Sequence, residues 1–87
     1  MAEYILIIKK SAEKEIANLP LPIVEKLYKE FTNLSRNPRP NGVRKLSGFK
    51  NLYRMRLGDY RVVYSIEDNV LIIHVLKVGH RKDVYKF

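Results

Sequence analysis

The sequence predicts a small α+β fold in which an N-terminal strand precedes an antiparallel two-helix hairpin, packed on one face of a mostly antiparallel sheet of about four strands. Strand-length apolar segments at residues 3–8, 53–57, 60–64 and 70–78 predict the strands. Apolar residues with helical spacing lie between the first two segments. With 87 residues and 46% hydrophobic content, the chain is expected to form one domain, residues 1–87, in the order β-α-α-β-β-β with a short C-terminal tail.

The segment at residues 3–8 is β-branched and almost entirely apolar. Such a segment is typical of a strand that is buried on both faces or lies at the centre of a sheet. Ser11 is then a suitable N-cap for a short helix over residues 12–19. Pro20 and Pro22 end this helix, and Pro22 can occupy the first position of a second one.

The second helix is predicted by apolar residues at positions 24, 27, 28, 31 and 34, which share one helical face, and it should end near Ser35. Residues 37–42 contain two prolines, and we expect a loop there. The apolar stripes of the two helices can cover one face of the sheet.

The two central strands form a hairpin whose register follows from its turn. Gly58-Asp59 lies between the two strands and is typical of a type II′ turn, which needs positive φ at its first central position. This turn pairs Leu57 with Tyr60, Arg56 with Arg61, Met55 with Val62, Arg54 with Val63 and Tyr53 with Tyr64. One face of the hairpin is then apolar and tyrosine-rich, and we expect the helices to cover it. The other, which we call the arginine face, holds Arg54, Arg56 and Arg61 and is expected to stay open.

Three arginines on one face need an explanation, because like charges directly opposite each other destabilise a sheet. They can form a solvated surface, with their stems lying over apolar groups. A converging set, with Arg56 opposite Arg61, instead favours an anion site. Phosphate suits the planar, bidentate guanidinium group.

Residues 70–78 form the last predicted strand, and two registers are open. A two-residue turn before it places His74 on the arginine face and Lys77 in the core, whereas a three-residue turn does the reverse. Burying an unpaired lysine is costly. We therefore expect the three-residue turn, with Lys77 beside the arginines and His74 in the core.

The positive charge is concentrated in the second half of the chain. Lys and Arg number 17 against 9 Asp and Glu, a net charge of +8. Residues 1–43 carry 7 basic and 5 acidic side chains, whereas residues 44–87 carry 10 and 4. This pattern is the electrostatic footprint of a nucleic-acid-binding surface. No membrane partner is expected, because the apolar segments are too short to span a bilayer and no basic amphipathic helix or lipidation signal is present.

The absence of cysteine excludes disulfides, thiolate metal sites and cysteine nucleophiles. The acidic residues of the second half lie in turns or in the tail, without the cluster that a divalent metal needs. We therefore expect no metal and no other cofactor. The N-terminus lacks the features of a signal peptide, so a cytoplasmic location is expected.

The motifs KLSG, YRMRL, GDYRVVY and VGHRKDVY begin at residues 45, 53, 58 and 78. In this order and spacing they resemble the RelE branch of the RelE/ParE superfamily of toxin–antitoxin toxins, over nearly the whole chain. The resemblance implies an endoribonuclease that cuts mRNA in the ribosomal A site. The positions that match the family's catalytic residues are Arg54, Arg56, Arg61, Arg81 and Tyr85. In the family's best-known member the first two are lysines, so arginine keeps the charge and changes the geometry.

The implied chemistry is attack of the RNA 2′-OH on the adjacent phosphate, without metal. Tyr85 can act as the base only if clustered cations lower its pKa from the usual value of about 10. The resemblance implies Arg81 as the proton donor, but a pKa above about 12 suits it better to stabilising the leaving oxygen. Further residues of this half are expected to bind RNA: Arg44, Lys45, Lys77, His80 and Lys82.

The resemblance also implies a RelB-like antitoxin as partner in a hetero-oligomeric complex. The ribosome and mRNA are further expected partners, and operator DNA is reached only through the antitoxin. Two other functions stay open: a ParE-like toxin that poisons DNA gyrase, and an inactive domain that only binds RNA or a partner. An acid–base pair of His74 and His80 and a metal nuclease fit the sequence less well.

Overall fold

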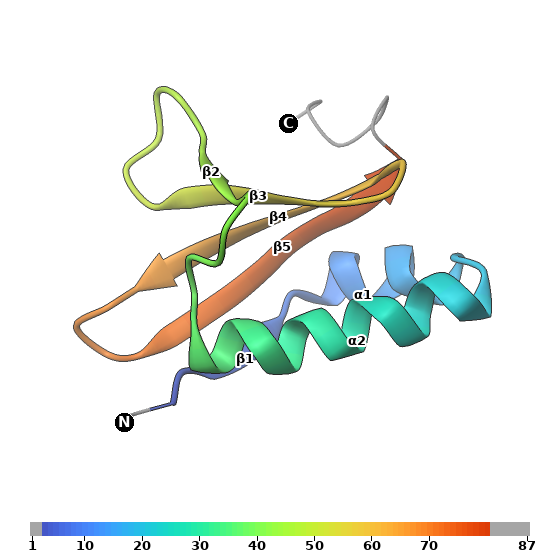
Figure 1. The fold of residues 1–87 in the computed structure, drawn as a ribbon, viewed down its shortest axis with the longest axis horizontal. Coiled ribbons are helices and arrows are strands. Elements are labelled where there is room, and N and C mark those ends of the chain that lie inside the picture. The colour runs from blue at the N-terminus through green and yellow to red at the C-terminus, as the bar shows by residue number, and fades with distance from the viewer. Residues whose placement is uncertain (1–2, 81–87) are drawn as a thin grey trace.

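The computed structural model describes residues 3–80 and has the predicted α+β architecture, with one more strand than expected. The sheet has the strand order β1-β5-β4-β3-β2, in which β1 and β5 are parallel and all other pairs are antiparallel. Both helices lie on one side of this sheet (Figure 1). In chain order the elements are β1 (Ile5–Ile8), α1 (Lys10–Ala17), α2 (Leu21–Arg36), β2 (Arg44–Lys45), β3 (Leu52–Leu57), β4 (Tyr60–Glu67) and β5 (Ile72–His80).

Strand β1 is an edge strand, so the expectation of a strand buried on both faces or at the sheet centre is wrong. It pairs only with β5, and its side chains alternate between the core and the opposite surface. Leu6 and Ile8 pack against the core, whereas Ile5 and Ile7 are 64% and 40% exposed. A uniformly apolar segment indicates a strand, but it does not show whether that strand lies at the edge or at the centre of the sheet.

The helices are close to their predicted positions. Helix α1 begins at Lys10, before the predicted start, and Lys9 takes the N-cap position without a side-chain hydrogen bond. Ser11 therefore lies inside the helix, and its expected capping role is wrong. Helix α2 begins at Leu21, so Pro22 lies at its second position and not at the predicted first one, and the helix buries Leu27, Phe31 and Leu34. These three side chains join the core on the helix side of the sheet.

The register of the hairpin formed by β3 and β4 is confirmed for every predicted pair. Gly58 has a φ of +61°, as a type II′ turn requires at its first central position. Met55, Val62 and Tyr64 consequently belong to the buried core. The hydroxyl of Tyr64 donates a hydrogen bond of 2.8 Å to the backbone carbonyl of Pro38, which ties the connector after α2 to the sheet.

The register of β5 combines the two alternatives that the sequence left open. Glu67 pairs with Ile72 across a four-residue connection, and a bulge in β5, opposite Val63 and Tyr64, shifts the register farther along. His74 therefore lies opposite Ser65 and Lys77 opposite Val63, both on the side away from the helices. The predicted three-residue turn and the core position of His74 are wrong, because the bulge lets both side chains share one face.

Between residues 3 and 80, neither helix has the length and apolar character that crossing a membrane requires.

Candidate functional site

The cross-strand register brings residues of four neighbouring strands onto the side of the arginine face. Arg44 of β2 pairs with Arg54 of β3, which pairs with Val63 of β4, which pairs with Lys77 of β5. A second row runs from Arg56 to Arg61 and ends at Gly79. Strand β2 was not predicted, and its pairing adds Arg44 to the three expected arginines.

Arg56 and Arg61 form the predicted cross-strand pair but differ in accessibility. Arg56 is exposed, whereas Arg61 is only 4% exposed. The Nη1 atom of Arg61 donates hydrogen bonds of 3.0 Å to the carbonyls of Gly58 and Tyr60, at the turn of the hairpin. Its Nε is buried and has no hydrogen-bond partner among residues 3–80. Leaving such a donor unpaired costs about 1–3 kcal/mol, and a hydrogen bond from this nitrogen to an anion would offset that cost.

The expectation that the arginine face is open along its whole length is wrong at its centre. Val63 is fully buried although it lies on this face, and Arg61 is nearly so. Val63 stands in a row between Arg54 and Lys77, whose long side chains flank it. Arg61 is drawn inwards because its guanidinium pairs with backbone carbonyls. The accessible charge of the face therefore comes from Arg44 and Arg56, which are exposed, and from the half-buried Arg54.

Lys77 shares a row with Arg54, but its ammonium group is engaged by helix α1. Its Nζ lies 3.1 Å from Oε2 of Glu15, and Oε1 of the same carboxylate accepts a 3.0 Å hydrogen bond from the backbone N–H of Val78. Glu15 thus accepts a hydrogen bond from a backbone N–H of β5 beyond the last residue of β5 that pairs with β1. The sequence analysis missed this residue, since a contact across 62 positions leaves no local signal.

Two of the expected RNA-binding residues point elsewhere by their register. Lys45 lies opposite Tyr53, and His80 lies opposite Tyr60, in the rows of the helix-facing side. The ring of His80 also makes an edge contact with Tyr60, with centroids 6.0 Å apart. Three expected site residues lie outside the described residues: Arg81, Lys82 and Tyr85.

A different arginine lies in a fully partnered environment, which we call the Arg39 cluster. Arg39 contacts both carboxylate oxygens of Asp68, at 3.2 and 2.8 Å, and its Nε donates to the hydroxyl of Tyr53 at 3.3 Å. The hydroxyl of Tyr4 donates to the same carboxylate at 2.6 Å. The hydrogen bonds from Arg39 and Tyr4 hold the pKa of Asp68 below its usual value. The same contact with Asp68 raises the pKa of Tyr4.

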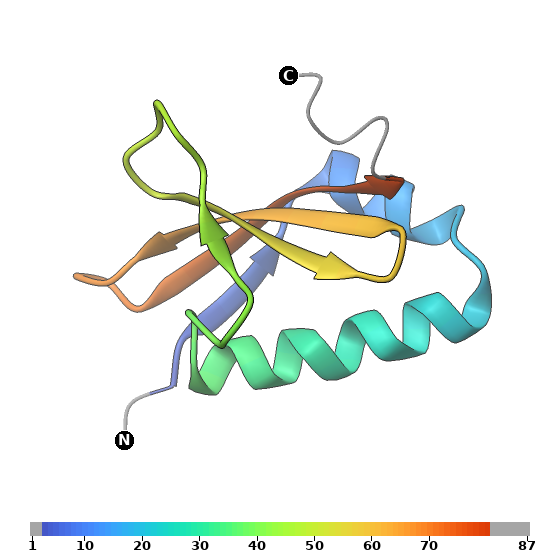
Figure 2. The ribbon, with the colours of Figure 1, turned by 45° about the horizontal axis from the view of Figure 1, so that its top comes forward.

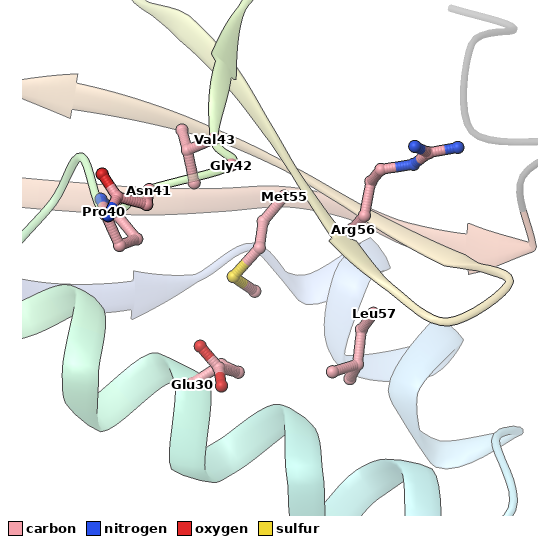
Figure 3. A pocket seen from close by; sticks show the side chains of 8 residues that line it. All are labelled: Glu30, Pro40, Asn41, Gly42, Val43, Met55, Arg56 and Leu57. Carbon is pink, nitrogen blue, oxygen red and sulfur yellow. The ribbon is translucent and has the colours of Figure 1, made fainter.

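A pocket of about 250 Å³ lies at the outer edge of β3, on the helix side of the sheet. Met55 and Leu57 point toward α2 and Glu30, whereas the side chain of Arg56 points away (Figure 3). Arg56 therefore borders both the pocket and the arginine face, with its guanidinium group directed away from the pocket.

Residues 3–80 contain no group of three or more His, Cys, Asp or Glu side chains arranged to hold a metal ion. What the arginine face offers is fixed positive charge. Guanidinium groups presented side by side on a sheet can bind the oxygens of a phosphate and stabilise negative charge that develops on it.

Sequence and structure comparisons agree on one family. The profile of a family described as "ParE toxin of type II toxin-antitoxin system, parDE" matches residues 6–85. "Putative toxin RelE1" of Methanocaldococcus jannaschii is 31% identical over 84 residues, which are 91% of each chain. "mRNA interferase toxin RelE" of Escherichia coli K12 is 31% identical over 81 residues, covering 91% of this chain and 84% of the relative. A crystal structure of the archaeal RelE–RelB complex from Pyrococcus horikoshii OT3 superposes with a TM-score of 0.84 at 33% identity, over 94% of this chain and 99% of that one.

Proposed function

The chain belongs to the RelE/ParE superfamily of toxins from type II toxin–antitoxin systems, and on that premise we propose that it is a ribosome-dependent endoribonuclease that cleaves mRNA in the ribosomal A site. The observation that carries the proposal is the arginine face, with Arg56 directly opposite Arg61 and Arg44 opposite Arg54. A relative named mRNA interferase supports the same reaction class.

In the proposed reaction the 2′-OH of the RNA attacks the adjacent phosphate and the 5′-oxygen leaves. Arg54 and Arg56 bind the phosphate oxygens, and Arg61 contributes its buried, unpartnered Nε as the charge on phosphorus oxygens grows. Tyr85 is the proposed base and Arg81 stabilises the leaving oxygen. These two residues follow β5 in the sequence, and Gly79 at the end of β5 pairs with Arg61, which supports a role beside the same phosphate.

A RelB-like antitoxin is the proposed partner, because several similar solved structures are RelE–RelB complexes. The ribosome and mRNA are the further proposed partners, with the ribosome positioning a substrate that this small face cannot orient alone. A net charge of +8 also favours association with anionic partners.

Primer extension on mRNA from a bacterial translation reaction tests the proposal, with and without ribosomes. The wild-type protein should produce cuts within A-site codons only when ribosomes are present, and Arg81→Ala and Tyr85→Phe should abolish them. Intact mRNA from a wild-type protein that still arrests growth would refute the nuclease. A gyrase cleavage assay would then test the ParE-like alternative, which the matching family profile favours.

A further inference from the structure

The loop between β2 and β3 (residues 46–51) is a projecting element next to the arginine face. It rises from the sheet on the side away from the helices, as both ribbon views show (Figure 1, Figure 2). A hydrogen bond of 2.8 Å from the backbone N–H of Leu46 to the carbonyl of Leu52 closes its base. Gly48, with a φ of +82°, makes the turn at its tip. The loop therefore projects beside the arginine face, at the β2 edge of the sheet.

This loop carries an exposed aromatic side chain, Phe49, next to Lys50. Phe49 is 49% exposed, and Lys45 and Lys50 are both exposed. Strand β2 leads directly into the loop and places Arg44 opposite Arg54. Phe49 thus lies within five positions of Arg44, Lys50 and Arg54, and the segment from 43 to 57 contains no acidic residue.

Exposure alone does not make this residue a binding group, since single exposed apolar residues are normal. Val70 has the same exposure of 49%, but it follows Glu67 and Asp68 at the far end of β4. Tyr28 is 48% exposed on α2, on the helix side of the sheet. Phe49 differs from both because the loop that carries it rises on the side away from the helices (Figure 1) and its segment contains no acidic residue.

We propose that Phe49 is a stacking platform for an unpaired base of the mRNA strand whose phosphates lie on the arginine face. The inference rests on the proposed function, because RNA is its ligand. An aromatic side chain beside a cationic track is the arrangement by which proteins hold single strands: the cations bind the phosphates and the ring stacks on a base. The bound strand then extends from Arg56 past Arg54 and Arg44 to the β2–β3 loop. This contact lies outside the catalytic set and lengthens the recognised segment.

Phe49→Trp gives a direct test, because the chain contains no tryptophan. The variant is titrated with a 2′-O-methyl RNA oligonucleotide, which lacks the attacking hydroxyl and stays intact. We expect the indole fluorescence to be quenched as a base stacks on it. The matched control is Tyr28→Trp, at the same exposure on the helix side, and its fluorescence should not change. Unchanged fluorescence of the Phe49→Trp protein at saturating oligonucleotide would overturn the inference.

Phe49→Ala and Phe49→Leu separate stacking from charge. Both should bind the oligonucleotide about 5- to 150-fold more weakly than the wild type, the range that a single base–aromatic stack contributes. An abasic oligonucleotide of equal length should bind all three proteins equally. A loss of ribosome binding with unchanged oligonucleotide affinity would overturn the mRNA assignment in favour of ribosomal RNA.

The outcomes also separate this inference from the proposed function. Quenching without ribosome-dependent cleavage would retain the RNA contact and refute the nuclease. Cleavage without quenching, and with full activity of Phe49→Ala, would refute the stacking platform and leave the nuclease intact.

Discussion

Arg39 and the pair formed by Arg56 and Arg61 lie near opposite ends of β4 and are used in opposite ways. Arg39 has both oxygens of Asp68, a tyrosine hydroxyl and the ring of Tyr53 around it, with the ring centroid 5.1 Å from its Cζ. Arg56 and Arg61 face each other, and no carboxylate within residues 3–80 forms a salt bridge with either. Local pairing explains the first arginine as a structural group. The second arrangement costs stability in the isolated fold, and an anionic ligand would repay that cost.

The largest expected effect is on cleavage by the arginine face. Arg56→Ala should reduce ribosome-dependent cleavage by about 100- to 1000-fold, because one preorganised charge at the reacting phosphate is lost. Its stability should be unchanged or slightly higher, because a like-charge pair is removed. Rates of A-site cleavage and urea denaturation measure the two quantities.

Arg36→Ala is the matched control for this prediction. It removes the same charge from an exposed arginine of α2, which pairs with Glu3 at 3.4 Å on the helix side. Cleavage should change by less than about 2-fold, since exposed ion pairs contribute little. An equal loss in both variants would show that net charge matters and that the position of Arg56 does not.

The second largest effect is a loss of stability, and it concerns Tyr64 in the core on the helix side of the sheet. Tyr64→Phe removes a fully buried hydroxyl and leaves the buried carbonyl of Pro38 without its donor. We expect a loss of about 1–2 kcal/mol in the free energy of unfolding, with full cleavage activity per folded molecule. Tyr28→Phe, at an exposed position, should change stability by less than about 0.5 kcal/mol. A cleavage defect in Tyr64→Phe at low temperature, where the variant is folded, would show that the core on the helix side also contributes to cleavage.

The sequence predicts the features of both sides of the sheet that depend on local patterns. The register of β3 and β4 follows from Gly58 and Asp59, because a two-residue turn determines every later pair. The row of Arg56 and Arg61 was therefore predictable. Helix α2 was predictable for a similar reason, since its apolar period is local.

What the sequence does not predict depends on contacts between distant segments. The edge position of β1, the two-residue strand β2 and the bulge in β5 each depend on which strands meet in space. The ion pair of Lys77 with Glu15 belongs to the same class. The burial of Arg61 instead depends on its side chain folding back onto the carbonyls of Gly58 and Tyr60, which residue type alone does not predict. Residue type predicts that these groups are charged. Only the fold determines which of them keep their charge available.

Releasing Lys77 from its ion pair with Glu15 would add one available cation to the arginine face. Glu15→Gln keeps an oxygen that can accept from the N–H of Val78 and removes the charge that holds Lys77. The released ammonium group lies in the row of Arg54, so RNA should bind about 2- to 5-fold more tightly. The slope of log affinity against log salt concentration should become steeper by about 0.7, as one more cation meets a phosphate.

Glu25→Gln is the control for the release of Lys77, because it makes the same charge change at an exposed position of α2. It should leave the salt slope unchanged. Equal slopes for Glu15→Gln and the wild type would mean that Lys77 does not reach the RNA even when it is released.

The smallest effect concerns the pH dependence of the Arg39 cluster, whose side chains are partly exposed at 43% for Arg39 and 56% for Asp68. The pKa of Asp68 is lowered in the fold, first by Arg39 and then by Tyr4, from the ordinary value of 3.8. A lowered carboxyl pKa contributes stability that is fully present above the ordinary value and is lost as the pH falls through the folded one. A double-mutant cycle of Arg39→Ala and Asp68→Asn should therefore give a favourable coupling at about pH 7 that disappears as the pH falls through the lowered pKa of Asp68. A coupling that persists in acid would mean that a neutral hydrogen bond, and not the charge of Asp68, holds Arg39.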